Sequence, residues 1–408
     1  LGLLPGASGT QRLPRLIGAE KALDIMLSGK PVDASSALAA GVIDRVSNAP
    51  DLEANALAFA RDAITNGPRR ISEMSVAEVP SDFFAATRKN LAHKIRGQVS
   101  PGRIIDCVEV ATRTSFEEGL KKERQYFLEC LESPQSAALR HAFFAERQVS
   151  KVPGLGKETP IRDCSSAAII GAGTMGAGIA YSCLSAGLTV TLLDNSDEGL
   201  ERGRKTVEGL FAGGVKRGKI SESDMEQGLS RFATSQEYAD LKDVDIVIEA
   251  VFESMAVKKE VFGALDKVLK PGAILATNTS TLSIDEIAAS TSRPGDVIGL
   301  HFFSPAHIMR LLEIVKGAET RDDVIVTSLA LAKRLRKIGV VVGNCFGFVG
   351  NRMLYSYGRE NQLLLLEGAA PEYIDQTLYD WGMAMGPNAV GDLAGLDVGY
   401  KIRQERTD

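Results

Sequence analysis

Residues 167–176 read AAIIGAGTMG, an apolar run that passes into a turn of the form G-x-G-x-x-G. This turn predicts a dinucleotide site at the start of a helix. Gly171 permits the tight turn, Gly173 lets a pyrophosphate approach the backbone, and Gly176 lets the helix pack on the strand. We therefore expect the helix N-terminus to meet the phosphates of a cofactor.

The residues after the turn strengthen this prediction. A second apolar run, residues 188–193, ends on Asp194, where a carboxylate would bond the ribose hydroxyls. The same carboxylate favours NAD over NADP, because it would repel a 2′-phosphate. The alternative is a structural turn, since 40 glycines in 408 residues will sometimes fall at this spacing. The cofactor-binding residues expected here are Gly171, Gly173, Thr174, Met175, Gly176 and Asp194.

Composition narrows the class of protein. With 44% hydrophobic and 24% charged residues, the chain has the make-up of an ordinary globular protein, and its length suggests two or three domains. A net charge of −5 gives no reason to expect nucleic acid or an anionic membrane as partner. No apolar run approaches the roughly 20 residues of a membrane span. Small molecules are therefore the expected partners.

The cysteines argue against a disulfide framework and against a zinc site, because they are scattered, odd in number and lack a C-x-x-C pair. They are Cys107, Cys130, Cys164, Cys183 and Cys345. A reducing compartment fits this pattern, and no metal is expected. The chain opens on Leu1 rather than Met, so we expect it to be an internal part of a longer protein.

A Pro/Gly-rich stretch, KVPGLGKETP at residues 151–160, predicts the main boundary in the chain. Before it, apolar residues recur at helical spacing and little strand is visible. After it, strands alternate with helices, which is typical of a doubly wound parallel sheet and an α/β fold. The expected strands are 167–170, 188–194, 245–250, 273–278, 297–303, 311–315 and 340–343.

Helices are expected in three further places. A long charged hairpin covers roughly residues 198–229, and a separate helical domain follows Gly347, with helices at 349–366 and 371–381. Ahead of the boundary, Ser115 and Glu118 form a capping box that starts another helix. The residues expected on the core face of that helix are Phe116, Leu120, Phe127 and Leu131.

One of only four histidines lies where chemistry is expected. His301 ends an apolar strand, and ligands of open α/β sheets bind at the carboxyl ends of strands. Glu313 lies in the next apolar strand, where a carboxylate is costly unless it is paired. Bonded to one ring nitrogen, Glu313 would leave the other nitrogen to remove a hydroxyl proton. The alternatives are a core histidine bonded to backbone and an edge-strand glutamate that faces water.

Other polar residues gather near the same sheet edge. Ser280 follows a strand in a hydroxyl-rich turn and could bond a substrate oxygen, whereas Ser283 with Glu286 is explained as a helix capping box. Asn351 lies at an expected helix start. Glu253 and Lys258 follow the strand that ends near residue 250, close to the expected cofactor cleft; alone, they would be interpreted as surface charges.

Four segments together resemble the L-3-hydroxyacyl-CoA dehydrogenases over about residues 164–400. They are GAGTMGAGIA (171–180), NTSTLSI (278–284), GLHFFSPAHIMRLLEIV (299–315) and GNCFGFVGNRML (343–354). The opening residues 1–34 are similar to the rear part of an enoyl-CoA hydratase/isomerase domain. The combination resembles the multifunctional fatty-acid β-oxidation enzymes of bacteria and peroxisomes.

The resemblance implies a fold and its division. Residues 1–150 would be the mostly helical rear part of a crotonase-like domain with linker helices, and 151–163 a linker. Residues 164–343 would form a Rossmann-type NAD-binding domain with a doubly wound parallel sheet. Residues 344–408 would form part of an α-helical dehydrogenase C-terminal domain.

The resemblance also implies an activity, the NAD-dependent oxidation of (3S)-3-hydroxyacyl-CoA to 3-oxoacyl-CoA. The implied roles are His301 as general base, Glu313 as its orienting partner, Ser280 and Asn351 as substrate or cofactor contacts, and Asp194, Glu253 and Lys258 as cofactor contacts. The alternatives are a non-catalytic module that binds NAD or CoA, and another Rossmann hydroxyacid dehydrogenase. The expected partners are an acyl-CoA substrate and, for the longer protein, a second copy or a thiolase. The expected location is the bacterial cytoplasm, or the peroxisome in a eukaryote.

Two departures from the family pattern concern the site. Ser304 stands where the dehydrogenases usually have an asparagine after His301, which puts one hydrogen bond of the substrate site in doubt. The two catalytic glutamates of the hydratase family belong to a segment that would precede Leu1. We therefore expect residues 1–408 alone not to hydrate enoyl-CoA, an activity expected of the longer protein.

Overall fold

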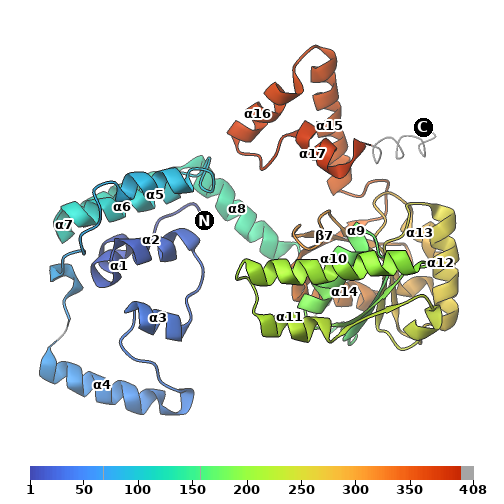
Figure 1. Ribbon diagram of the computed structural model, residues 1–408, viewed down its shortest axis with the longest axis horizontal. Helices are drawn as coiled ribbons and strands as arrows, with labels where there is room; N and C mark the ends of the chain where they lie inside the picture. Colours follow the sequence, from blue (N-terminus) through green and yellow to red (C-terminus); the bar gives the residue numbers. More distant parts are fainter. Residues whose placement is uncertain (68, 157, 397–408) are drawn as a thin grey trace. The chain divides into compact units, whose positions relative to one another are not determined.

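The computed structural model describes residues 1–67, 69–156 and 158–396. Within these residues the chain forms two compact units, each described here by itself. Unit 1 comprises residues 1–145 and 377–384, and unit 2 comprises 146–376 and the residues from 385 onward. Figure 1 follows the chain from its blue N-terminal helices to its red C-terminal ones.

Unit 1 is helical, as its apolar spacing predicted. Its α-helices are α1 (Gly9–Ile17), α2 (Ala19–Ser28), α3 (Ala34–Ala40), α4 (Leu52–Asn66), α5 (Phe83–Leu91), α6 (Ser100–Arg113), α7 (Phe116–Glu132), most of α8 (Pro134–Gln148) and the end of α16 (Pro371–Trp381). Its core forms around α6, where Ile105 and Val108 are fully buried and pack with Leu23 and Phe84. An amphipathic helix gains most of its stability from packing of this kind.

The predicted core face of α7 was wrong in part. The capping box of Ser115 and Glu118 is present, but the buried positions of the helix are Gly119, Glu123 and Cys130, and Leu131 is 37% exposed. Glu123 can be buried because its oxygens accept the backbone N–H groups of residues 8 and 10 and the Thr10 hydroxyl. A carboxylate supplied with donors packs inward in place of an apolar side chain.

Unit 2 is built on an eight-stranded sheet in the order β3-β2-β1-β4-β5-β6-β7-β8. The strands are β1 (Ser166–Ile170), β2 (Thr189–Leu193), β3 (Phe232–Ser235), β4 (Ile246–Glu249), β5 (Ile274–Thr277), β6 (Val297–Phe302), β7 (Leu311–Lys316) and β8 (Ile338–Gly343). All neighbours are parallel except β6 and β7, which are antiparallel. The α/β class and the seven predicted strands are confirmed.

The sequence missed β3, the edge strand beside β2. It has only four residues, and none of them is buried. A short edge strand with one paired side has neither the continuous apolar run nor the alternation that marks a strand in sequence.

Helices cover both faces of the sheet, as a doubly wound fold requires. One face carries α9 (Thr174–Ser185), α10 (Asp197–Lys216) and α14 (Asp322–Arg334), and α11 (Glu222–Leu229) lies beside them. The other carries α12 (Met255–Val268) and α13 (Ile284–Ala288) (Figure 1). The hairpin predicted at 198–229 is α10 and α11. The order of the strands reverses between β1 and β4, and open α/β sheets bind ligands at such a point, beyond the carboxyl ends of the strands.

Three helices follow the sheet: α15 (Gly350–Leu366), α16 (Pro371–Trp381) and α17 (Pro387–Ala394). The predicted all-helical C-terminal region is therefore confirmed over the described residues. Through residue 396, leaving aside positions 68 and 157, no helix is both long and apolar enough to cross a bilayer.

Candidate active site

The glycine-rich turn joins β1 to α9 with the local geometry that its sequence predicted. Gly171 has a φ of +98°, and a Cβ there would lie 2.7 Å from the carbonyl oxygen of Ala250. At Gly176 a Cβ would lie 1.8 Å from the carbonyl oxygen of residue 171. A Cβ at Gly173, by contrast, would meet nothing within 4 Å. Two glycines therefore let the backbone pack, and the third leaves open space at the N-terminus of α9.

Asp194 lies beside this turn at the end of β2. Its Oδ2 accepts the backbone N–H of Ala172 at 2.8 Å, and its Oδ1 accepts that of Ser196 at 3.3 Å. Thr174 and Met175 form the first residues of α9, where unpaired N–H groups favour an anion. The open space over Gly173, the helix N-terminus and the half-buried carboxylate fit the pyrophosphate and ribose of a dinucleotide.

His301 and Glu313 face each other across the antiparallel strands β6 and β7. His301 Nδ1 lies 2.7 Å from Glu313 Oε2, and the two residues are 5% and 1% exposed. The two alternatives considered from the sequence, a histidine bonded to backbone and a glutamate that faces water, are therefore not what the fold contains. The pairing follows from the short connection between β6 and β7, which places the two residues in register.

The second carboxylate oxygen of Glu313 also accepts hydrogen bonds. Oε1 accepts the backbone N–H groups of Val349 and Gly350, at 3.0 and 2.8 Å, just where α15 begins. Burial alone would raise the pKa of Glu313, but the hydrogen bonds from His301 and from these two amides outweigh it and lower the pKa. The side chain is therefore an ionised carboxylate at neutral pH, suited to orienting an imidazole.

Aromatic rings surround the imidazole of His301. The rings of Phe303 and Phe348 have centroids 4.4 and 5.7 Å from that of His301. Among the described residues, Nε2 of His301 forms no hydrogen bond within the protein, whereas Nδ1 is taken by Glu313. With Nδ1 protonated toward the carboxylate, Nε2 is the nitrogen able to accept a proton from a bound hydroxyl.

Ser280 and Asn351 also come together. Asn351 Nδ2 donates to the Ser280 carbonyl at 3.4 Å, and Ser280 donates its N–H and hydroxyl to Glu253 Oε1 at 2.7 and 3.0 Å. Ser280 is thus held in place by Glu253 and Asn351.

Ser283 caps α13, as predicted, but the side chain of Glu286 pairs with Lys259 and does not complete the capping box.

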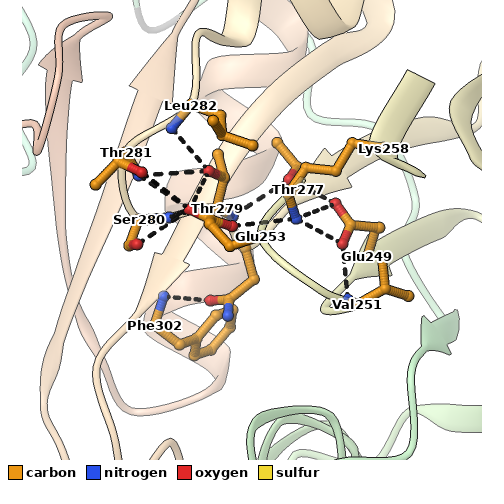
Figure 2. A network of polar contacts seen from close by, with 11 residues as sticks. Glu249, Val251, Glu253, Lys258, Thr277, Thr279, Ser280, Thr281, Leu282 and Phe302 are labelled. Carbon is orange, nitrogen blue, oxygen red and sulfur yellow. Dashed lines mark hydrogen bonds and ion pairs between the residues drawn. The ribbon is translucent and has the colours of Figure 1, made fainter. Parts of the chain in front are cut away.

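Lys258 is not the surface charge that its sequence position alone would suggest, and Glu253 is only partly exposed. Lys258 is 1% exposed, and its Nζ lies 2.8 Å from Oε1 of Glu249, a fully buried residue that sequence reasoning did not single out (Figure 2). One feature of the sequence could have identified Glu249: it ends the apolar strand IVIE, so its carboxylate needed a buried partner.

In the described part of the chain, no group of three or more His, Cys, Asp and Glu side chains could hold a metal ion.

The models of three protein families match parts of the chain. Residues 166–345 match "3-hydroxyacyl-CoA dehydrogenase, NAD binding domain" and residues 347–408 match "3-hydroxyacyl-CoA dehydrogenase, C-terminal domain". Residues 1–125 match "Enoyl-CoA hydratase/isomerase".

Two curated relatives align along almost the whole chain. The peroxisomal bifunctional enzyme of Cavia porcellus is 43% identical over 413 residues, which cover 99% of this chain and 56% of that enzyme. The fatty acid oxidation complex subunit alpha of Shewanella amazonensis is 38% identical over 411 residues, 98% of this chain and 58% of that protein. The chain thus spans little more than half the length of these relatives.

A solved structure matches more than half of the chain. The (S)-3-hydroxybutyryl-CoA dehydrogenase of Ralstonia eutropha is 39% identical, with a TM-score of 0.55. The match covers 58% of this chain and 84% of that enzyme.

Proposed function

The chain belongs to the 3-hydroxyacyl-CoA dehydrogenase family, with a segment of the enoyl-CoA hydratase/isomerase family ahead of it, and from this premise we propose its reaction. It oxidises (3S)-3-hydroxyacyl-CoA to 3-oxoacyl-CoA in fatty-acid β-oxidation, with NAD as the oxidant. The observation that carries the proposal is the buried contact of 2.7 Å between His301 and Glu313.

In this reaction His301 removes the proton of the 3-hydroxyl group through Nε2. Glu313 holds the imidazole in the required tautomer through Nδ1 and stabilises the imidazolium that forms. NAD, when bound, would supply the oxidant for this reaction by taking up the hydride from C3 of the substrate. A positioned general base of this kind contributes about 10²- to 10⁴-fold to the rate.

Ser280 and Asn351 bind the substrate or the cofactor beside this base. Asn351 donates to the carbonyl of Ser280, and the backbone N–H of Gly350 donates to Glu313. These two contacts support one continuous site that extends from the turn after β5 to the start of α15. The cofactor would be held at the carboxyl ends of β1, β2 and β4, where the order of the strands reverses. The residues that would hold it are Gly171, Gly173, Thr174, Met175, Gly176, Asp194 and Glu253. Lys258, which is 1% exposed, would contribute to this site through Glu253, whose Oε2 lies 3.4 Å from its Nζ.

We also propose the division of the chain expected from its sequence. Residues 1–150 form the rear part of a hydratase/isomerase domain, 151–163 a linker, 164–343 the NAD-binding domain and 344–408 part of the C-terminal domain. For the whole protein we propose a hydration step on 2-enoyl-CoA and assembly with a second copy or a thiolase. Relatives from peroxisomes and from a bacterium support either a peroxisomal or a bacterial cytoplasmic location.

The test is the formation of NADH by the purified protein with a (3S)-3-hydroxyacyl-CoA, and in parallel with the free 3-hydroxy acid. Turnover of the CoA ester alone is the expected result. Turnover of the free acid alone would indicate another hydroxyacid dehydrogenase. Binding of NADH without turnover of either substrate would indicate a non-catalytic module.

A further inference from the structure

Glu249 is a fully buried carboxylate at the end of β4 that none of the roles above uses. In the sheet it lies beside Ile170 of β1 and Thr277 of β5, so it is enclosed by strands on both sides. Burying a carboxylate is costly unless donors surround it. Its partners therefore show what the fold gains by keeping a charge there.

Glu249 has three partners in addition to its place in the sheet. It accepts the N–H of Val251 and the hydroxyl of Thr277, both at 2.7 Å. Its two oxygens lie 2.8 and 3.0 Å from Nζ of Lys258 (Figure 2). Both oxygens of the carboxylate therefore have donors, Oε1 from Val251 and Lys258 and Oε2 from Thr277 and Lys258.

Lys258 connects this buried carboxylate to a second one nearer the surface. Its Nζ lies 3.4 Å from Oε2 of Glu253, whose side chain is 30% exposed. The other oxygen of Glu253, Oε1, accepts the Thr279 hydroxyl at 2.6 Å and the Ser280 N–H at 2.7 Å. Figure 2 shows that the contacts run without a break from Glu249 to the turn that carries Ser280.

The charges explain why Glu249 and Lys258 occur as a buried pair. Lys258 is 1% exposed, and a buried ammonium is stable only beside a compensating carboxylate. Burial would raise the pKa of Glu253, yet Lys258 and the hydroxyl-rich turn outweigh it and lower the pKa. Without Glu249, the ammonium would keep only its longer contact to Glu253.

We propose that Glu249 is a positioning residue of the cofactor site: it fixes the ammonium of Lys258, which fixes Glu253 and through it the Ser280 turn. The inference rests on the proposed function, because Glu253 is a cofactor contact there and Lys258, which is 1% exposed, acts through it. Glu249 itself touches neither cofactor nor substrate, since it is enclosed at the end of the sheet.

Asp245 provides a matched control at the opposite end of the same strand. It directly precedes β4, pairs with Lys270 at 2.6 Å and accepts the backbone N–H groups of Ser165 and Ser166. Like Glu249, it joins a lysine to strand ends by charged hydrogen bonds. It lies at the amino ends of the strands, however, away from the glycine-rich turn and His301.

The experiment measures three properties of the full chain carrying Glu249→Gln, Glu249→Asp or Asp245→Asn. They are the NADH dissociation constant by fluorescence titration, the melting temperature without cofactor, and kcat and KM for NAD. Glu249→Gln should raise the NADH Kd and the KM for NAD by about tenfold, the size of a typical coupling between contacting residues. The kcat at saturating NAD should stay within about threefold, because His301 is untouched.

Glu249→Asp separates position from charge. It keeps the charge balance of the cluster but is one methylene shorter, so it should weaken NADH binding even where the melting temperature is close to that of the wild type. Asp245→Asn should lower the melting temperature and leave the Kd unchanged. Wild-type affinity for NADH in the folded Glu249→Asp or Glu249→Gln variant would overturn the proposal.

The same measurements distinguish a failure of this proposal from a failure of the proposed function. If the wild type binds NADH, the Glu249 variants weaken it, and no 3-hydroxyacyl-CoA is oxidised, then the positioning role stands and the proposed reaction is wrong. If the wild type does not bind NADH at all, both are wrong.

Discussion

Glu313 uses its two carboxylate oxygens for different contacts. Oε2 orients His301, and Oε1 accepts two amides where α15 begins. One side chain therefore links the proposed base to the first helix of the C-terminal region. Changes at His301 and at Glu313 should accordingly have different effects on stability.

His301→Gln should lower kcat by about 10²- to 10⁴-fold, because an amide cannot accept the hydroxyl proton. NADH affinity should remain within about twofold, since the cofactor is held by other residues. NADH formation with a 3-hydroxyacyl-CoA measures the first effect and fluorescence titration the second. His141→Gln, on the exposed face of α8, is the control and should behave as the wild type. A His301→Gln variant that kept more than about a tenth of the wild-type kcat would show that another group is the base.

Glu313→Gln should slow turnover as well, because a neutral amide cannot stabilise an imidazolium. Unlike His301→Gln, it should also lower the melting temperature, by roughly the 2–4 °C that corresponds to about 1 kcal/mol. The reason is that the amides of Val349 and Gly350 lose a charged acceptor. An unchanged rate would remove Glu313 from the site, and an unchanged melting temperature would remove its role in holding α15.

At the scale of elements, the connections from β1 to α9 and from β2 to α10 carry the proposed cofactor specificity. Asp194 follows β2 directly, and the next three residues, Asn195, Ser196 and Asp197, include no arginine that could neutralise a 2′-phosphate. On α10, Arg204 donates to the Thr234 hydroxyl at 3.0 Å.

We expect kcat/KM to be at least about tenfold higher with NAD than with NADP, since one repelled phosphate is worth about 1.4 kcal/mol or more. Asp194→Ala should reduce this ratio, mainly by weakening NAD binding. Steady-state kinetics with both cofactors provide the measurement. Equal kcat/KM values for the wild-type protein would contradict the role given to Asp194.

Two glycines of the turn, Gly173 and Gly176, should respond differently to the same substitution by alanine. Gly173→Ala should fold normally, because its φ of −71° suits alanine and its Cβ would meet nothing within 4 Å. It should nevertheless weaken NADH binding, since the methyl group occupies the space left for the pyrophosphate. Gly176→Ala should lower the stability by about 1–3 kcal/mol, because its Cβ would meet the carbonyl of Gly171.

Melting curves and NADH titrations of the two variants distinguish these effects. A Gly173→Ala protein with wild-type affinity would contradict the proposed position of the phosphates. A Gly176→Ala protein as stable as the wild type would contradict the close packing of α9 on β1.

At the scale of the whole molecule, charged networks tie distant segments together. Arg162, near the end of the proposed linker, donates to Asp323 on α14 and pairs with Asp296 before β6. Several carboxyl groups of unit 2 are partly or largely buried and have a lowered pKa in the folded protein: Asp245, Glu253, Asp266, Glu313 and Asp323. For most of them burial acts in the opposite direction and is outweighed by hydrogen bonds and neighbouring cations.

The free energy of unfolding should therefore decrease at acidic pH. A carboxyl whose pKa is lower in the folded state than in the unfolded chain contributes its full stabilisation above the unfolded value, near 4.5 for glutamate. This contribution is lost as the pH falls from there through the lower folded values. Urea unfolding between pH 7 and pH 3 should show a midpoint that is constant at first and then decreases below about pH 4.5. A midpoint that rose on acidification would contradict the assignment of these groups.

The sequence by itself determined those features whose causes are local. The glycine-rich turn could be predicted because each glycine answers a steric need within a few residues. The buried strands and long helices could be predicted because apolar periodicity reports burial. His301 and Glu313 could be paired because they lie in consecutive strands joined by a short connection.

Only the tertiary structure decided the partners of the remaining polar groups. Three contacts join segments whose spacing in the chain does not indicate that they pair. They are the contacts of Glu249 with Lys258, of Glu253 with the Ser280 turn, and of Glu313 with α15. The inward face of α7 and the edge strand β3 were likewise set by neighbouring elements. The physical reason is that a charged residue can be buried only where other segments bring donors or counter-charges, and its position along the chain does not encode them.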